Sequence, residues 1–131
     1  MTAISPQERS DVRVELLTLV HSFDAHGQTN HTPHIFAYQI RITNESEETV
    51  VLNSRKWILK YEDGEQEVYE GDGIVGKIVM LEPEESFEYG SFHMVGRDCA
   101  VEGAYHGYSD TQDHIWARIP KFHLHIPDKL A

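Results

Sequence analysis

Apolar residues recur at every second position along most of this chain, and no segment shows the 3.6-residue period of an amphipathic helix. The runs are rich in Val, Ile, Tyr, Phe and Trp, which are favoured in half-buried strands. Strands are predicted at roughly 12–23, 36–42, 49–61, 66–69, 77–81, 86–95, 99–108 and 115–126. This pattern predicts an all-β fold, a two-sheet antiparallel β-sandwich.

Two local signals make the prediction specific. Between Leu16 and Leu17 the apolar face of segment 12–23 changes phase, as a β-bulge requires. Asp63-Gly64 separates two strand runs and is a strong hairpin signal. We therefore expect a bulged first strand and a tight hairpin in the middle of the chain.

The length of the chain fits one domain, because 131 residues can bury a sizeable core. No linker, repeat or low-complexity tract divides it. We expect a single domain over residues 1–131, with a core at about 12–127 and a flexible tail at 1–11.

The charge balance argues against two classes of partner. The 22 acidic residues outnumber the 11 Lys and Arg, and a net charge of -11 repels nucleic-acid phosphates and anionic lipid headgroups. No apolar run approaches the roughly 20 residues of a membrane span. The single cysteine, Cys99, follows the pattern of a buried thiol in a reducing compartment. We expect a cytoplasmic protein that neither binds nucleic acid nor enters a membrane.

Five short motifs together resemble the bacterial ApaG family in order and spacing. They are Arg55-Lys56-Trp57-Ile58, Gly71-Asp72-Gly73-Ile74-Val75-Gly76, Ser86-Phe87-Glu88-Tyr89, Val101-Glu102-Gly103-Ala104-Tyr105 and Ile119-Pro120-Lys121-Phe122. The resemblance covers about Arg13 to Pro127 and implies a sandwich of the fibronectin type III or immunoglobulin kind. It also implies an association with cobalt resistance and magnesium efflux. Related eukaryotic domains are attached to an F-box protein and to a polymerase-delta-interacting protein, settings that favour protein recognition.

Three positions depart from the family pattern. Ile78 stands where a proline is frequent, Glu84 where a glycine is usual, and Asp72 between the first two glycines. Each departure touches the glycine-rich segment or the chain that leaves it. They weaken the transfer of a phosphate-binding role to this chain.

The segment 71–76 matches Gly-x-Gly-x-x-Gly, in which backbone amides approach a pyrophosphate at a helix N-terminus. Here the following segment, 77–81, is typical of a strand, and Gly96 stands where an acidic residue would bind a ribose. Six acids between Glu62 and Asp72 would also repel a diphosphate. The dinucleotide-binding interpretation fails, and a tight β-turn explains the glycines.

Candidate partner-binding or ligand-binding residues gather around this loop. They are Gly71, Asp72, Gly73, Gly76, Lys77 and Arg55. Arg55 is a cation beside an aromatic strand in an acidic protein, so it is either a recognition anchor or the partner of a nearby Glu. Trp57 and Tyr61 are predicted to belong to the core.

No catalytic constellation stands out. Neither Ser86, Ser91 nor Cys99 forms a recognised spacing with a histidine, and His123 with His125 supplies only two metal ligands. We predict no catalytic residue, metal ligand or cofactor, and a non-enzymatic module that docks an unknown protein through a sheet edge or the glycine-loop end. The alternative is a small-ligand sensor for a divalent cation or a nucleotide pyrophosphate at the glycine-rich loop.

Overall fold

The computed structural model describes residues 6–24 and 31–128, and these form nine strands. The strands are β1 (Gln7–Glu8), β2 (Val12–Phe23), β3 (His34–Asn44), β4 (Val50–Tyr61), β5 (Gln66–Asp72), β6 (Val79–Leu81), β7 (Ser86–Val95), β8 (Cys99–Ser109) and β9 (His114–Leu124). The described residues contain no helix long and apolar enough to cross a membrane.

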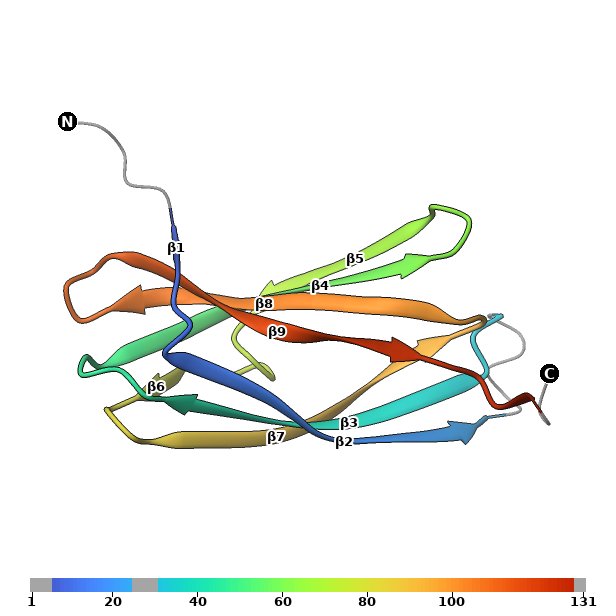
Figure 1. Ribbon diagram of the computed structural model, residues 1–131, viewed down its shortest axis with the longest axis horizontal. Helices are drawn as coiled ribbons and strands as arrows, with labels where there is room; N and C mark the ends of the chain where they lie inside the picture. Colours follow the sequence, from blue (N-terminus) through green and yellow to red (C-terminus); the bar gives the residue numbers. More distant parts are fainter. Residues whose placement is uncertain (1–5, 25–30, 129–131) are drawn as a thin grey trace.

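The strands form two sheets that pack face to face (Figure 1). The larger sheet has the order β1-β9-β8-β4-β5, and β6 also pairs with β4. The smaller sheet has the order β2-β3-β7. All pairs are antiparallel except β1 with β9. The predicted two-sheet sandwich is confirmed.

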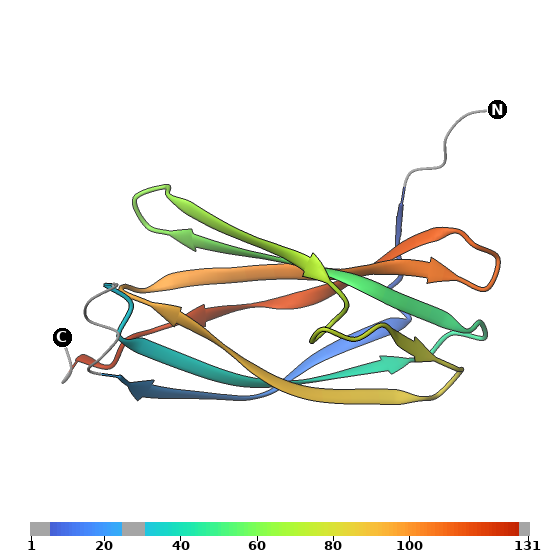
Figure 2. The same cartoon turned by 180° about the vertical axis from the view of Figure 1, so that it is seen from behind.

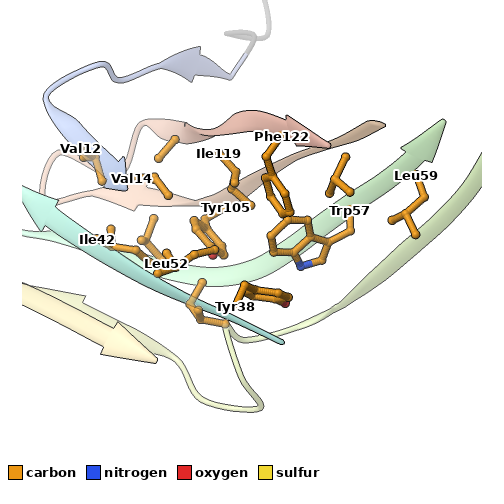
Figure 3. Packing of buried hydrophobic residues seen from close by; sticks show 14 of the residues in the cluster. Val12, Val14, Tyr38, Ile42, Leu52, Trp57, Leu59, Tyr105, Ile119 and Phe122 are labelled. Atoms are coloured by element: carbon orange, nitrogen blue, oxygen red, sulfur yellow. The ribbon is translucent and has the colours of Figure 1, made fainter. Parts of the chain in front are cut away.

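The core lies between the sheets and follows the period-two pattern of the sequence. Trp57 lies between Tyr38 and Phe122, with ring centroids 5.3 and 6.2 Å away (Figure 3). Trp57 and Tyr61 are both buried, as predicted. Full burial of one large apolar side chain contributes about 1.5–3 kcal/mol, so these aromatic contacts hold the two sheets together.

The two local predictions are also confirmed. The pairing of β2 with β3 shifts between Leu16 and Thr18, which places the bulge at the predicted phase change. Gly64 has φ +92 in the turn that joins β4 to β5. The hairpin therefore uses its glycine for a left-handed conformation, as the Asp-Gly signal indicates.

Around the glycine-rich segment the predicted boundaries are wrong. β5 extends to Asp72, so Gly71 and Asp72 belong to a strand, whereas β6 does not begin until Val79. The reason is that the chain turns at Gly73 and Gly76, which have φ +72 and +76. The strand predicted at 77–81 is shortened accordingly.

The start of the described chain is attached to the larger sheet. Gln7 and Glu8 pair with β9. Arg9 then forms ion pairs of 2.9 and 2.8 Å with Asp11 and Glu48. The prediction of a flexible tail at 1–11 therefore does not hold for residues 7–11, and residues 1–5 lie outside the described part.

The two sheets do not cover one another completely. The β4–β5 hairpin projects away from the three-stranded sheet (Figures 1 and 2). Every residue of β5 is exposed or half-buried, including Val68 and Tyr69, whereas β4 alternates between buried and half-buried positions along most of its length. The inner face of β5 is therefore uncovered, and β7 lies at the neighbouring edge of the smaller sheet.

Candidate functional site

A cleft of about 410 Å³ opens between the β4–β5 hairpin and β7. Its lining includes Arg55, Trp57 and Tyr69 from the larger sheet and Tyr38, Ser91 and His93 from the smaller one. This volume is within the range of ligand sites, and such sites combine an apolar lining with a few polar groups. The lining of this cleft has that composition.

The register of β4 and β5 explains the upper wall of the cleft. Trp57 pairs with Tyr69, and Arg55 pairs with Gly71. Directly paired residues project from the same face of a sheet, and Trp57 faces the core. The side chains of Tyr69 and Arg55 are therefore on the inner face as well, where the smaller sheet leaves them uncovered.

The lower wall comes from β3 and β7. Ser91 pairs with Tyr38, and His93 pairs with the buried Phe36. The His93 ring centroid lies 4.8 Å from that of Trp57 and 5.1 Å from that of Tyr38. Burial lowers the pKa of His93 to about 4, so the imidazole is neutral at pH 7. Its Nε2 has no hydrogen-bond partner among the described residues.

Arg55 joins the cleft to the glycine-rich segment. Its Nη1 donates hydrogen bonds to the carbonyl oxygens of Asp72 at 2.6 Å and Gly73 at 3.2 Å. In the described part of the chain no carboxylate lies within 4.0 Å of this guanidinium. The expected ion pair with a nearby Glu is wrong, and Arg55 tethers the main chain of the loop instead.

Two amides of the loop are already used within the protein. Gly73 donates its N–H to Asn53 O at 2.7 Å, and Ile74 donates to Lys77 O at 2.8 Å. Ile74 is also buried and anchors the loop to the core. An anion-binding loop needs free amides that point at the ligand, so the amides of Gly73 and Ile74 are not available to a pyrophosphate.

Of the predicted site residues, the structure brings Arg55, Gly71, Asp72 and Gly73 together. The other two, Gly76 and Lys77, are exposed on the turn, and of all six predicted residues only Arg55 lines the cleft.

Sequence reasoning missed the lower wall of the cleft and assigned Trp57 to the core only. Alternation in 86–95 does place Ser91 and His93 on the same face as Tyr89. It does not reveal that β7 lies at an edge opposite Tyr69, because strand order is a long-range property.

A second hollow of about 390 Å³ includes Asp98, Cys99, His123 and His125. His125 Nδ1 lies 2.8 Å from Asp98 Oδ2, and burial raises the pKa of the Cys99 thiol to about 11. The thiol is therefore protonated and a poor nucleophile. Across residues 6–24 and 31–128, no three His, Cys, Asp or Glu side chains are grouped to hold a metal ion.

Comparison with known proteins gives the family. Residues 24–108 match the model of the ApaG domain. The chain belongs to the ApaG domain family. Protein ApaG of Anaeromyxobacter dehalogenans (strain 2CP-1) is 38% identical over 97 residues, which cover 73% of this chain and 78% of the relative. Protein ApaG of Bradyrhizobium diazoefficiens is 35% identical over 96 residues, covering 72% of this chain and 74% of that relative.

Two solved structures share the fold of this chain. The crystal structure of the putative ApaA protein from Bordetella pertussis has a TM-score of 0.71 at 23% identity and covers 95% of this chain and 99% of that one. The X-ray structure of a structural-genomics target has a TM-score of 0.77 at 25% identity and covers 89% and 88% of the two chains. The shared fold thus extends over nearly all of this chain.

Proposed function

We propose that this domain is a protein-recognition module that docks an extended segment of a partner along the free edge of β7. The observation that carries the proposal is that this edge has no paired strand, has few of the residues that usually prevent strand addition, and opens into the aromatic cleft. A strand added there would gain main-chain hydrogen bonds from β7 and would place alternate side chains in the cleft.

The sequence of β7 supports this choice of edge. Proteins usually protect free edges with lysines, prolines, bulges or charged residues. β7 pairs with β3 along its whole length, from the Ser86 and Thr43 pair to the Val95 and His34 pair, without a register shift. Its ten residues include no Lys or Pro and one charged residue, Glu88.

Two other edges carry such protecting features. At the opposite edge of the smaller sheet, β2 has the bulge at Leu16 and the charged residues Arg13 and Glu15. At one edge of the larger sheet, β5 has Glu67, Glu70 and Asp72. The contrast favours β7 as the edge that accepts a partner.

The location of the cleft supports the same proposal. A segment paired with β7 would lie under the inner face of β5, where Tyr69 offers exposed aromatic surface beside the buried Trp57. The net charge of -11 favours a partner with a basic surface around this segment. Metal phenotypes of the kind that the family resemblance implies would then arise through the partner protein.

Selection of displayed random nine-residue peptides on the domain, followed by ¹H–¹⁵N shift mapping, tests the proposal. We expect selected peptides to shift amide signals of β7 and the Tyr69 region. Alternate N-methylation of a selected peptide gives a specific test of strand pairing. One set of alternate amides faces β7, so methylating that set should abolish binding, and methylating the other set should not.

Two exposed aromatic residues provide matched variants. Phe92 lies on β7, and Tyr108 lies on β8, where it pairs with His114 beside the β8–β9 turn. We expect Phe92→Lys to weaken peptide binding at least fivefold and Tyr108→Lys to leave it unchanged. Shifts that map away from β7, or tolerance of both methylation patterns, would show that the proposed docking mode is wrong.

A further inference from the structure

Three consecutive rungs of the β4–β5 pair present different chemistry on the inner face of the larger sheet. Arg55 pairs with Gly71, Trp57 with Tyr69, and Leu59 with Glu67. Successive rungs on one face are about 6.6 Å apart, so the first and third are separated by roughly 13 Å. A cation, an aromatic pair and a carboxylate thus follow one another along the wall above the proposed docking edge.

The Arg55 guanidinium has no ion-pair partner among the described residues. Each of the other arginines in the described chain has a carboxylate within 4.0 Å: Arg9, Arg13, Arg41, Arg97 and Arg118. Arg55 is half-buried, and within residues 6–24 and 31–128 it forms hydrogen bonds only through Nη1, to two main-chain carbonyl oxygens. A guanidinium has five N–H donors, so further donors remain for a carboxylate from outside the chain.

The carboxylate of Glu67, at the third rung, is held in place by hydrogen bonds and also lacks an ion-pair partner among the described residues. Tyr61 and Tyr69 donate their hydroxyls to Oε1 and Oε2 of Glu67. The hydrogen bond to Glu67 raises the pKa of Tyr69 to about 12, so this hydroxyl remains a donor at neutral pH. No Lys or Arg of the described residues lies within 4.0 Å of Glu67. Two tyrosines therefore position a half-buried anion that is available to an incoming cation.

The direction of β7 sets the order in which an added strand would meet these groups. Near the beginning of β7, the Tyr89 hydroxyl contacts that of Tyr105, which pairs with Arg55. Just after its end, the Arg97 guanidinium carbon lies 4.1 Å from the centroid of the Tyr61 ring. β7 therefore runs from the Arg55 rung toward the Glu67 rung, and an antiparallel segment would run from Glu67 toward Arg55.

We propose that the segment docked along β7 carries a basic residue, an aromatic or large apolar residue, and an acidic residue at positions i, i+2 and i+4. The basic residue contacts Glu67, the middle residue packs on the exposed Tyr69 in the cleft lined by Trp57, and the acidic residue contacts Arg55. Alternate residues of a strand project from one face, so all three reach the wall above β7. This inference rests on the proposed docking of a segment at β7 and specifies its sequence.

A blocked seven-residue peptide tests the order of charges. Threonine occupies the odd positions, and lysine, tryptophan and glutamate occupy positions 2, 4 and 6. Its affinity is measured by fluorescence anisotropy at about 150 mM salt, where long-range attraction is screened. We expect replacement of the glutamate by glutamine to weaken binding to the wild-type domain about tenfold.

Protein variants assign each contact. The Arg55→Gln domain should bind the peptides with glutamate or glutamine at position 6 equally well. The Glu67→Gln domain should bind the peptides with lysine or glutamine at position 2 equally well. The Gly73 and Ile74 amide signals report whether Arg55→Gln disturbs the loop. A peptide with lysine and glutamate exchanged should bind about tenfold more weakly than the original.

The outcomes separate this inference from the proposed function. Peptides that shift β7 signals but bind equally well with glutamate or glutamine would overturn the charge order and leave docking at β7 intact. Equal binding of the exchanged peptide would overturn it as well. If neither the seven-residue peptides nor selected peptides bind at β7, the proposed function itself is wrong.

Discussion

The guanidinium of Arg55 occupies the space that a side chain at Gly71 would need. A Cβ added to Gly71 would lie 2.7 Å from Nη2 of Arg55. The glycine therefore makes room for the arginine that tethers Asp72 and Gly73. The pair couples the upper wall of the cleft to the glycine-rich loop.

Substitution of Gly71 by Ala should displace Arg55 and break this tether. We expect the free energy of unfolding to fall by about 1 kcal/mol, the net value of one or two partly exposed hydrogen bonds from a cation. In Arg55→Met, Gly71→Ala should cost nothing further, because the obstructing group is gone. Urea denaturation of the two single variants and the double variant measures this coupling, and strictly additive losses would contradict it.

Gly90 provides the control for that substitution. A Cβ there would meet Tyr38 O at 3.5 Å, an ordinary contact, and its φ is not positive. We therefore expect Gly90→Ala to leave stability unchanged or slightly raised, as is usual for Gly to Ala in a strand.

Gly73 and Gly76 both have positive φ but differ in the space around them. A Cβ at Gly73 would lie 2.6–2.8 Å from main-chain atoms of Lys77, whereas nothing lies within 4 Å at Gly76. Gly76→Ala should cost about 1–2 kcal/mol for the left-handed backbone alone. Gly73→Ala should cost clearly more, about 3 kcal/mol, because main-chain atoms must also move. Denaturant midpoints of the two variants compare them directly, and equal losses would show that the turn accommodates the clash.

Much of the fold could be predicted from the sequence because its signals are local. Period-two alternation identified the strands, the phase change at Leu16 gave the bulge, and Asp63-Gly64 gave the hairpin. Each depends on neighbouring residues only. The short motifs around Arg55 and Gly71 likewise indicated the family without any knowledge of the strand order.

The cleft could not be predicted because it depends on strand order and on the unequal widths of the sheets. Tyr69 and His93 belong to different sheets and line the same cleft because the β4–β5 hairpin projects away from the three-stranded sheet. The boundary error at Gly71 has a different cause. Strand propensity is low for glycine, yet pairing with Arg55 keeps this residue extended, so tertiary context outweighs propensity.

The turn before β7 contains a strained residue. Glu82 O accepts a hydrogen bond from Glu85 N at 3.0 Å, Pro83 is the second residue, and Glu84 is the third with φ +73. A type II turn requires positive φ at its third position, which favours glycine. This explains why the family resemblance places a glycine where this chain has Glu84.

Glu84→Gly should therefore stabilise the domain. Relief of the left-handed conformation gains about 1–2 kcal/mol, and the extra freedom of glycine in the unfolded chain offsets about 0.5–1 kcal/mol of this. We expect a net gain of about 0.5–1 kcal/mol and a rise of about 2–4 °C in the thermal midpoint. Glu84→Ala removes the same side chain without the freedom of glycine and should give no gain. A similar rise in both variants would assign the effect to the charge.

His93 should make the stability of the domain depend on pH. Its pKa is lowered to about 4 in the folded state by burial, against about 6.5 in the unfolded chain. Between these values the unfolded state binds the proton more readily, so stability is present above pH 6.5 and is lost as pH falls toward 4. The loss by pH 4.5 should be about 2–3 kcal/mol.

The variant His93→Leu should remove this component. Because Nε2 has no partner among the described residues, an apolar side chain of similar volume gives up no hydrogen bond from it and should be no less stable than wild type at pH 7. The comparison is the change in unfolding free energy between pH 7 and pH 4.5, measured by urea denaturation of both proteins. Other groups that titrate in this range, such as His34 and His106, contribute to both and cancel in the difference. An equal loss in wild type and variant would mean that the imidazole accepts its proton without leaving the core.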